Sequence, residues 1–399
     1  MYVLGIESTC DETGAAIVED GRKVLSNVVA SSADVHVRYK GVFPELASRR
    51  HLEAIQPVVE EALAKAQITP EQIDLIAVAR GPGLIGSLLV GLQFAKGLAL
   101  AWDKPWIGVN HVEAHLYAAM MQAPLPLQFP ALGLVLSGGH TLLLKINAVG
   151  SYERIGTTVD DAIGEAFDKV ATLLDLPYPG GPHVETLAKR GNPKRFPLAA
   201  GKVKKSPLDF SFSGLKTSVL YAMKGQNATE NKSFSDQEKA DLAASFQETA
   251  LRDCVDKAKL AAVQFSCRSL FLGGGVCNNE RLRALFAEAF SVPGCSCKTP
   301  PPRKIDDFDA HCKSRLAGSF CSGDGHLRGE GEPEQMQWAG KARFSCGGEF
   351  CNCIPVYFPS FELTVDNAAM IAGLGYEKFL IDPTPAPFDL EAVTRIPIA

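Results

Sequence analysis

The sequence of 399 residues lacks an uninterrupted apolar segment long enough to cross a membrane. The longest apolar stretch, Leu84–Ala101, contains Gln93, Lys96 and three internal glycines, which is typical of a buried helix. The first residues also lack the basic start and apolar core of a signal peptide. We therefore expect a cytoplasmic protein with no membrane association.

A large excess of charge of one sign is also missing. The net charge of −5 argues against a protein that coats nucleic acid by bulk charge, although it leaves room for a local basic patch. Hydrophobic residues make up 46% and charged residues 21%, which excludes wholesale disorder and is typical of a globular enzyme. A chain of this length predicts two lobes.

Cysteine is sparse in most of the chain, because seven of the eleven cysteines lie between Cys295 and Cys353. Four scattered cysteines do not make the disulfide framework of a secreted scaffold. Within the rich block, two Cys-x-Cys pairs could form a zinc module, but they lack the Cys-x2-Cys spacing of known knuckles and ribbons. We expect residues 291–353 to be a Cys-rich insertion that is disordered or foreign to the fold.

The rest of the chain mixes strands and helices. Short apolar and β-branched runs predict strands over 2–6, 14–18, 23–29, 73–79, 107–109, 131–136, 141–146 and 269–272. Helical periodicity predicts helices over 48–66, 84–101, 161–174, 182–189, 236–262 and 366–379, and further helices from about 111 and 279. Asp366 is expected at the N-cap of the closing helix. This pattern predicts an α/β protein with two mixed sheets.

His111 and His115 are the first candidate site. On a helix, residues four apart share a face about 6 Å apart, so the two imidazoles could hold one metal ion, or could simply form hydrogen bonds in a polar interface. If the fold brings Asp366 close, two histidines and a carboxylate suit iron(II) or zinc. A zincin protease needs glutamate directly after the first histidine, where this chain has Val112, so that interpretation is excluded.

Two glycine-rich turns follow predicted strands, at Ser137–Thr141 and at Gly273–Gly275. Backbone N–H groups in such turns can hold phosphate oxygens, although either segment could be only a turn. Two of them in one α/β chain favour a nucleotide site. Neither matches Gly-x4-Gly-Lys-Ser/Thr, so a P-loop enzyme is not expected.

Two charged segments stand out. Asp161, Glu165 and Asp168 share one predicted helix face, where like charges repel, so we expect a hydroxyl or cation partner unless the face is merely solvated. Residues 189–205 carry seven lysines and arginines. They are either a solvated loop or the place where RNA phosphates dock.

Longer motifs resemble the tRNA N6-adenosine threonylcarbamoyltransferase family, the universal threonylcarbamoyladenosine synthases once described as glycoproteases. The resemblance covers nearly the whole chain apart from 291–353. The matching stretches are 5–13, 43–51, 81–88, the histidine motif at 111–115, 137–141, 160–169, 179–182, 209–217, 274–279 and 366–372.

This resemblance implies a two-lobed fold like actin, Hsp70 and the sugar kinases, with mixed sheets around a nucleotide cleft. Residues 1–110 and 366–399 would form the first lobe, and 111–290 and 354–365 the second. The implied reaction moves the threonylcarbamoyl group from threonylcarbamoyl-AMP to N6 of the adenosine at position 37 of tRNAs that read codons beginning with A, and releases AMP. A paralogous subunit of the same fold and a small ATPase are the implied protein partners. The alternatives are a phosphotransferase or ATPase of the same superfold, and a non-catalytic scaffold paralogue.

The resemblance also implies roles for individual residues. His111, His115 and Asp366 would bind one divalent metal ion, Fe2+ with Zn2+ as the alternative. Glu12, on the opening hairpin, would position or deprotonate the attacking amine unless it only caps the turn. The substrate would be bound by Leu136, Ser137, Gly138, Gly139 and His140 at its phosphate and acyl part, and by Asp168, Gly181, Glu185 and Asn279 at its nucleoside.

Overall fold

A computed structural model describes residues 1–32, 36, 41–204, 206–225, 234–291, 344–346, 349–351 and 353–398. Within the Cys-rich block, β10 (Phe344–Cys346) and β11 (Glu349–Cys351) pair as an antiparallel hairpin. The prediction of a zinc module or a disordered insertion otherwise falls outside the described residues.

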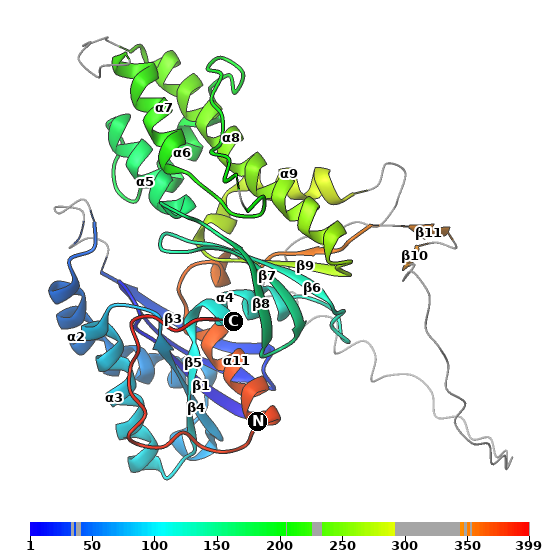
Figure 1. Cartoon of the computed structure of the whole chain (residues 1–399). Coiled ribbons are helices and arrows are strands. Elements are labelled where there is room, and N and C mark those ends of the chain that lie inside the picture. Colours follow the sequence, from blue (N-terminus) through cyan, green and yellow to red (C-terminus); the bar gives the residue numbers. More distant parts are fainter. Residues whose placement is uncertain are drawn as a thin grey trace, which may run out of the picture.

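The first sheet contains five strands in the order β3-β2-β1-β4-β5 (Figure 1). Its strands are β1 (Tyr2–Glu7), β2 (Glu12–Glu19), β3 (Lys23–Ser31), β4 (Leu75–Gly81) and β5 (Trp106–Asn110). β1 to β3 pair antiparallel, whereas β4 is parallel to both β1 and β5, so the sheet is mixed. Alternate residues of β1 face opposite sides: Leu4 and Ile6 pack against α2 (Pro44–Ala66) and α3 (Ile85–Trp102), and Val3 packs against α11 (Ala368–Ile381).

The second sheet has the order β12-β9-β6-β7-β8. Its strands are β6 (Ala131–Leu136), β7 (Thr141–Ala148), β8 (Ser151–Thr157), β9 (Ser269–Gly273) and β12 (Val356–Tyr357). One face packs against a helical group made of α5 (Ile163–Leu173), α6 (Gly180–Ala188), α7 (Ser213–Lys224), α8 (Asp236–Gln264) and α9 (Glu280–Phe290). The other face packs against α4 (His111–Met120). Figure 1 shows the helical group beyond the sheet on the side away from α4.

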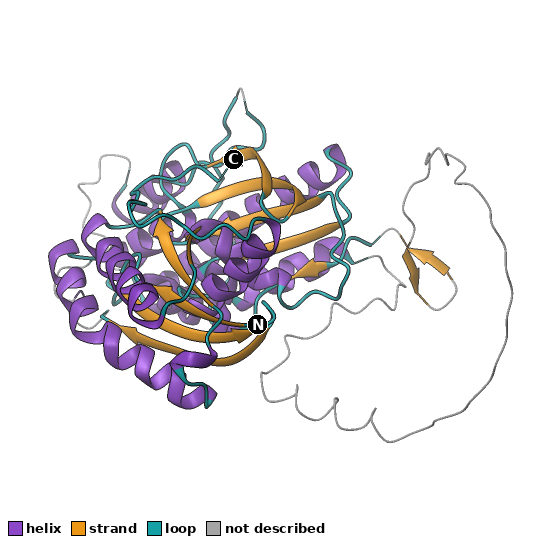
Figure 2. Cartoon of the chain, turned by 90° about the horizontal axis from the view of Figure 1, so that it is seen from below, coloured by secondary structure: helices purple, strands orange, loops and turns teal. Residues whose placement is uncertain are grey.

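Helices α4 and α11 join the two sheets. A single apolar cluster contains Val3 of the first sheet, Val135 of the second sheet, and residues of both helices. Figure 1 shows this pair between the sheets, and Figure 2 shows the strands in two groups with helices between them. The two mixed sheets predicted from the sequence are therefore confirmed, while the residue bounds of the two lobes stay a prediction.

Most predicted elements are present with small shifts at their ends. The expected N-cap of the closing helix is wrong: α11 begins at Ala368, and the side chain of Asn367 accepts a hydrogen bond from the Met370 amide at 3.1 Å. The prediction missed β8, β12 and α7. β8 lies at the sheet edge with mostly exposed or half-buried residues, so it lacks the apolar run on which the prediction depended.

The apolar helix α3 has the length and composition to cross a membrane. Leu88, Leu92 and Ala95 are buried on its inner side, where it contacts α2 and β4. A buried core helix passes the same test of length and composition. The prediction of a buried helix is confirmed for this inner side, whereas Ile85, Leu89 and Leu100 are exposed on the other.

Candidate metal and nucleotide site

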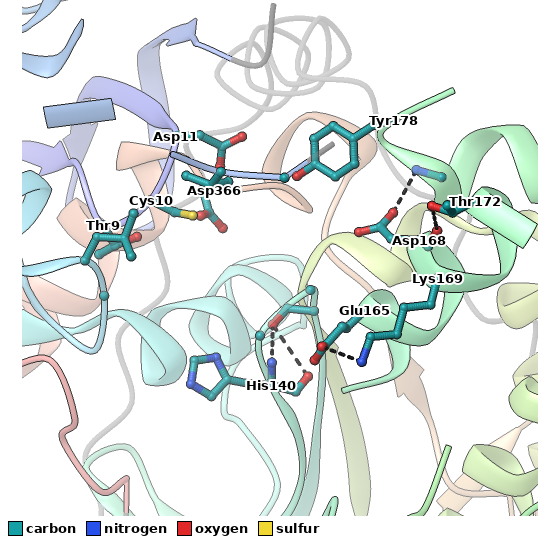
Figure 3. A pocket seen from close by; sticks show the side chains of 18 of the residues that line it. Thr9, Cys10, Asp11, His140, Glu165, Asp168, Lys169, Thr172, Tyr178 and Asp366 are labelled. Carbon is teal, nitrogen blue, oxygen red and sulfur yellow. Dashed lines mark hydrogen bonds and ion pairs between the residues drawn. The ribbon is translucent and has the colours of Figure 1, made fainter. Parts of the chain in front are cut away.

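A cavity of about 960 Å³ opens where the two sheets meet (Figure 3). Segments far apart in the sequence line it: the β1–β2 turn, the start of α4, the glycine turn between β6 and β7, α5 with the loop that follows it, and the residue preceding α11. Among its lining residues are Cys10, His111, Gly139, Asp168 and Asp366.

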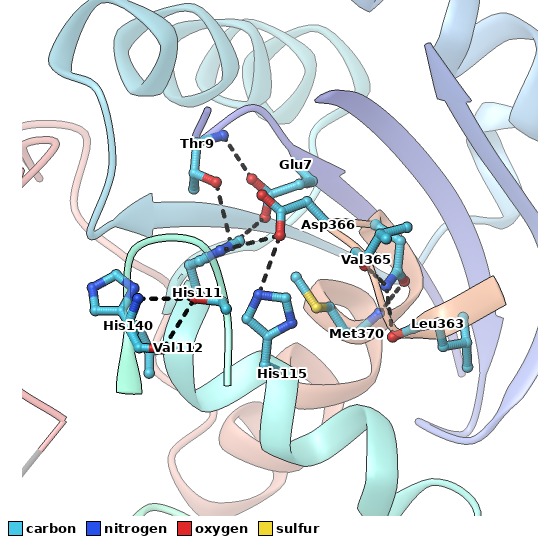
Figure 4. A network of polar contacts seen from close by, with 12 residues as sticks. Glu7, Thr9, His111, Val112, His115, His140, Leu363, Val365, Asp366 and Met370 are labelled. Carbon is cyan, nitrogen blue, oxygen red and sulfur yellow. Dashed lines mark hydrogen bonds and ion pairs between the residues drawn. The ribbon is translucent and has the colours of Figure 1, made fainter. Parts of the chain in front are cut away.

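His111, His115 and Asp366 converge at one end of this cavity, and their ligand atoms all lie within 4.8 Å of one another (Figure 4). The Asp366 Oδ1 atom is 3.6 Å from Nε2 of His111 and 3.2 Å from Nε2 of His115. The two rings meet edge to face, with centroids 4.6 Å apart. The structure thus brings together the three residues that the sequence predicted as ligands.

Helix α4 is held at both ends, which fixes the two imidazoles. At its start, the Asn110 side chain accepts hydrogen bonds from the amides of Val112 and Glu113. At its end, the Arg22 guanidinium donates to the carbonyls of Met120 and Met121 at 2.8 and 2.9 Å, which satisfies carbonyls that the helix leaves unpaired.

Two polar contacts also tie α4 to α11. The buried carboxylate of Glu113 lies 2.7 Å from Lys378 Nζ, and the Tyr117 hydroxyl donates to Glu377 at 2.9 Å. These contacts connect the histidine helix to the helix that follows Asp366, so the three candidate ligands are held on one packed unit.

The fully buried carboxylate of Glu7, at the end of β1, lies behind His111. Nδ1 of His111 donates to Glu7 Oε2 at 2.9 Å, and the Thr9 amide donates to Glu7 Oε1 at 2.6 Å. The sequence analysis missed Glu7. Two signals could have pointed to it: a charged residue at the end of an otherwise apolar strand, and its place in the matching stretch 5–13.

These charges shift the protonation of the site. Burial lowers the pKa of His111, but the carboxylates of Glu7 and Asp366 outweigh burial and raise it to about 9. Burial alone would raise the pKa of Asp366, yet His111 and His115 hold it well below its usual range. At neutral pH the metal-free site therefore contains the Asp366 carboxylate beside a protonated His111 imidazole. A divalent cation could take the place of the proton on this imidazole.

The chemistry of the donor set fits a divalent metal ion. Both ring nitrogens of His115 are buried. Within the described part of the chain, Nδ1 has no hydrogen-bond partner, and Nε2 has only the 3.2 Å contact with Asp366. Incompletely paired polar atoms are costly when buried, and a cation bound beside Asp366 would give Nε2 a stronger partner. Two imidazole nitrogens and one carboxylate oxygen suit iron(II) or zinc and leave coordination positions open.

The glycine turn Ser137–His140 forms the next part of the cavity wall. The Ser137 amide donates to the His140 carbonyl at 2.9 Å, and the His140 amide donates to Ser137 Oγ at 3.0 Å. The amides of Gly138 and Gly139 have no hydrogen-bond acceptor among the described residues. Both glycines line the cavity, and a Cβ atom at either would meet nothing within 4 Å, so the backbone of the turn borders open space that can hold an anion.

Leu136 and His140 flank these glycines. The Leu136 side chain is fully buried in the core, so only its backbone can face a substrate. Burial, together with the positive charges of His111 and His115, lowers the pKa of His140 to about 4. Its imidazole is therefore neutral at pH 7 and can donate or accept a hydrogen bond.

The four residues predicted to bind the nucleoside do not all face the same cavity. Asp168 lines the large cavity and accepts a hydrogen bond from the Gly180 amide at 2.7 Å, and burial raises its pKa. A Cβ atom at Gly181 would meet nothing within 4 Å. Glu185 instead lines a separate cavity of about 310 Å³ and accepts a hydrogen bond from the Glu280 amide at 2.8 Å.

Asn279 is also outside the large cavity. It is buried, caps α9 by accepting from the Leu282 amide at 3.0 Å, and donates to Gln247 Oε1 at 2.8 Å. Its side chain therefore has structural hydrogen-bond partners within the chain. The predicted nucleoside roles of Glu185 and Asn279 stay predictions.

Glu12 lies at the start of β2, where Ser31 Oγ donates to its Oε1 at 3.4 Å. Burial and the negative charges of Asp366 and Asp11 raise its pKa to about 10. The carboxyl group is therefore protonated at neutral pH, which suits hydrogen-bond donation to a substrate and disfavours proton abstraction. This pKa shift favours positioning over proton abstraction, and the role of Glu12 stays a prediction.

Two of the three acidic residues near α5 have a cation partner, as predicted, whereas Asp168 accepts a hydrogen bond from the Gly180 amide instead. Lys169 of the same helix lies 2.6 Å from Asp161 Oδ1 and 2.8 Å from Glu165 Oε1. The sequence analysis assigned no individual role to several lining residues that lie in or beside the matching stretches. Figure 3 shows Thr9, Asp11 and Tyr178 among them.

Comparison with known proteins identifies the family of this chain. The sequence profile of the family described as tRNA N6-adenosine threonylcarbamoyltransferase matches residues 23–313. A protein of that name from Protochlamydia amoebophila (strain UWE25) is 50% identical over 399 residues, covering 100% of this chain and 98% of the relative. Another, from Chlamydia felis, is 44% identical over 383 residues, covering 95% of this chain and 92% of the relative.

Among solved structures, full-length HypF in the phosphate- and nucleotide-bound form is similar in fold, with a TM-score of 0.51 and 14% sequence identity. The similarity covers 95% of this chain and 55% of HypF. It supports the two-lobed architecture with mixed sheets and nothing further. The profile match and the identity of the full-length relatives decide the assignment: this chain belongs to the tRNA N6-adenosine threonylcarbamoyltransferase family.

Proposed function

We propose that the large cavity is the active site for threonylcarbamoyl transfer. The chain moves this group from threonylcarbamoyl-AMP to N6 of the adenosine at position 37 of tRNAs reading codons that begin with A, and AMP is released. One observation carries the proposal: His111, His115 and Asp366 converge in the cavity that also contains the unpaired amides of Gly138 and Gly139.

The proposed metal ligands are His111, His115 and Asp366, with Fe2+ as the proposed ion and Zn2+ as the alternative. When bound, the ion supplies Lewis acidity that polarises the carbamoyl carbonyl or stabilises the departing phosphate. The chain itself supplies orientation. An exocyclic adenine amine is a weak nucleophile, but a mixed anhydride with an AMP leaving group is already activated, so alignment of the two reactants accounts for much of the rate.

The protein groups around the substrate follow from the cavity wall. The amides of Gly138 and Gly139 hold the phosphate, and the neutral imidazole of His140 hydrogen-bonds the acyl part. Asp168 accepts a hydrogen bond from a nucleoside hydroxyl. The protonated carboxyl group of Glu12 orients the attacking adenosine from the β1–β2 side. The remaining proposed contacts are those of Leu136, Ser137, Gly181, Glu185 and Asn279.

The tRNA phosphates are proposed to contact the basic segment 189–204. No aspartate or glutamate occurs between residues 186 and 208. The lysines and arginines of residues 189–204 are exposed. In a chain of net charge −5, this is a local concentration of positive charge that suits a polyanion. We further propose a cytoplasmic location, a paralogous subunit of the same fold and a small ATPase as partners.

Replacing His111 with alanine tests the proposal. The substituted chain, assayed with its partner proteins and tRNA, should form much less threonylcarbamoyladenosine, as measured by mass spectrometry of digested tRNA. His183→Ala is the matched control, because His183 is an exposed imidazole of α6 that does not line the cavity. Undiminished product from His111→Ala would refute the metal role. Fast ATP hydrolysis that is independent of tRNA would favour the phosphotransferase alternative instead.

A further inference from the structure

The contact between Glu7 and His111 joins two buried ionisable groups behind the candidate metal site. Glu7 is fully buried and His111 is 7% exposed. Nδ1 of His111 donates to Glu7 Oε2 at 2.9 Å, while Nε2 of the same ring points toward Asp366 (Figure 4). A carboxylate behind an imidazole fixes both the orientation of the ring and the nitrogen that carries the proton.

We propose that Glu7 is a positioning residue for the metal site: its carboxylate keeps the proton of His111 on Nδ1 and leaves Nε2 free as the ligand. The inference rests on the proposed function, because it requires His111 to bind the ion. Glu7 does not touch the ion or the substrate and acts through the imidazole alone.

Glu7 is suited to this role because it receives two hydrogen bonds from opposite sides. The Thr9 amide donates to one carboxylate oxygen at 2.6 Å, and the His111 ring donates to the other. A carboxylate accepts both bonds, whereas glutamine offers only one carbonyl oxygen and one donor group. In Glu7→Gln, the amide oxygen would pair with the Thr9 amide, and the NH2 group would then face Nδ1.

That mismatch has a specific consequence. An NH2 group facing Nδ1 requires Nδ1 to accept, which moves the ring proton to Nε2 and removes the lone pair aimed at Asp366 and the ion. Glutamine has nearly the shape of glutamate, so packing around β1 changes little. The Thr9 hydroxyl, 3.3 Å from Nδ1, is the only other described group positioned to accept the ring proton. Thr9→Val combined with Glu7→Gln therefore removes both acceptors.

Glu113 provides a matched control. It is a second buried carboxylate, 3% exposed, on the helix that carries both histidines, but its partner is Lys378 and not an imidazole. Glu113→Gln removes a buried negative charge of the same kind and leaves the Glu7–His111 contact intact.

The experiment is a titration of the metal-free full-length chain with Co2+ alone, in which binding is monitored by the ligand-field absorption of the bound Co2+. Glu7→Gln should weaken Co2+ binding by about 10- to 100-fold, the range found when a partner behind a ligand is removed. The double variant with Thr9→Val should bind more weakly still. Glu113→Gln should keep near-wild-type affinity, because its amide oxygen can still accept a hydrogen bond from Lys378 and so preserve the contact between α4 and α11. Equal affinities for wild type and Glu7→Gln, or an equal loss in Glu113→Gln, would overturn the role of Glu7. A wild-type chain that binds no Co2+ would instead refute the metal site itself.

A second measurement does not depend on whether the variants fold. In the Zn2+-loaded wild-type chain with 15N-labelled histidine, nuclear magnetic resonance identifies the nitrogen that carries the proton. The inference expects a slowly exchanging proton on Nδ1 of His111 and the metal-bound shift on Nε2. A metal-bound Nδ1 would overturn it.

Discussion

Gly5, in the middle of β1, is where the closing helix comes closest to the first sheet. A Cβ atom added there would lie 2.2 Å from the carbonyl oxygen of Ala368 and 2.8 Å from the amide nitrogen of Ala372. Both are backbone atoms of α11, which cannot rotate away as a side chain can. Gly5→Ala must therefore displace the start of α11 by about 1 Å to restore ordinary contact distances.

That displacement reaches the candidate metal site, because Asp366 lies only two residues before the start of α11. Overpacking of this kind costs about 1 to 3 kcal/mol of unfolding free energy. A shift of about 1 Å in a catalytic group can cost roughly 100-fold in rate. We therefore expect Gly5→Ala to lower the urea midpoint, and to reduce both Co2+ affinity and threonylcarbamoyladenosine formation far more than the stability loss alone would explain.

Gly97→Ala is the control for Gly5→Ala. Gly97 is an exposed glycine inside α3, and a Cβ atom there would meet nothing within 4 Å. Alanine should stabilise the helix by about 0.5 to 1 kcal/mol and leave activity unchanged. The reasoning fails if Gly5→Ala keeps wild-type stability and wild-type Co2+ affinity. Such a result would mean that the backbone of α11 does not contact β1 closely at Gly5, or that a shift of α11 does not move Asp366.

Three further predictions concern charge. Lys378→Met leaves the buried carboxylate of Glu113 unpaired and should lower the unfolding free energy by about 2 to 3 kcal/mol, below the usual range for a buried pair because Lys378 is partly exposed. The pKa of His140 is about 4 in the folded chain and 6.5 in the unfolded chain, so the unfolded chain binds more protons between pH 4 and pH 6.5. The unfolding free energy should therefore fall by up to about 3 kcal/mol as the pH drops from 6.5 to 4. Replacing Lys194 and Arg195 with glutamine should weaken tRNA binding and reduce the salt dependence of log K by about 1 per charge.

Each of these has its own control. Adding Glu113→Gln to Lys378→Met should recover part of the lost stability in urea unfolding; no recovery would mean that the lysine acts by packing alone. His140→Gln should flatten the acid part of the pH profile of the metal-free chain, and an unchanged profile would contradict the low pKa. Lys65→Gln, on the exposed side of α2, should leave the salt slope of tRNA binding unchanged. A slope that drops equally in both variants would place the RNA elsewhere.

The fold could be predicted where the pattern of apolar residues is complete. The strand predicted over 131–136 matches β6, because an apolar run there ends at a glycine turn. β8 gave no comparable signal, because most residues of this edge strand are exposed or half-buried and so show no apolar pattern. β12 has two residues, too few for any periodicity. Local pattern thus predicts the buried elements, and the sheet edges depend on tertiary pairing.

The site could be predicted only in part for the same reason. The spacing of His111 and His115 places both on one helix face, and the structure agrees. That Asp366 joins them depends on α11 packing against β1 and α4, which no local spacing reveals. Glu7 lies within the matching stretch 5–13, but that stretch assigns it no role: its importance lies in a contact between the end of the first strand and a helix that begins about a hundred residues later.

The N-cap of α11 shows how a small error in a predicted boundary bears on function. The carboxylate of an aspartate at the N-cap accepts hydrogen bonds from the first amides of the helix. Here Asn367 takes that position, and its side-chain oxygen accepts from the Met370 amide while its amide group donates to the carbonyls of Leu363 and Val365. Asp366 is therefore released from capping and can turn its Oδ1 toward His111 and His115. A neutral cap beside a charged ligand lets one short segment both begin the helix and complete the metal site.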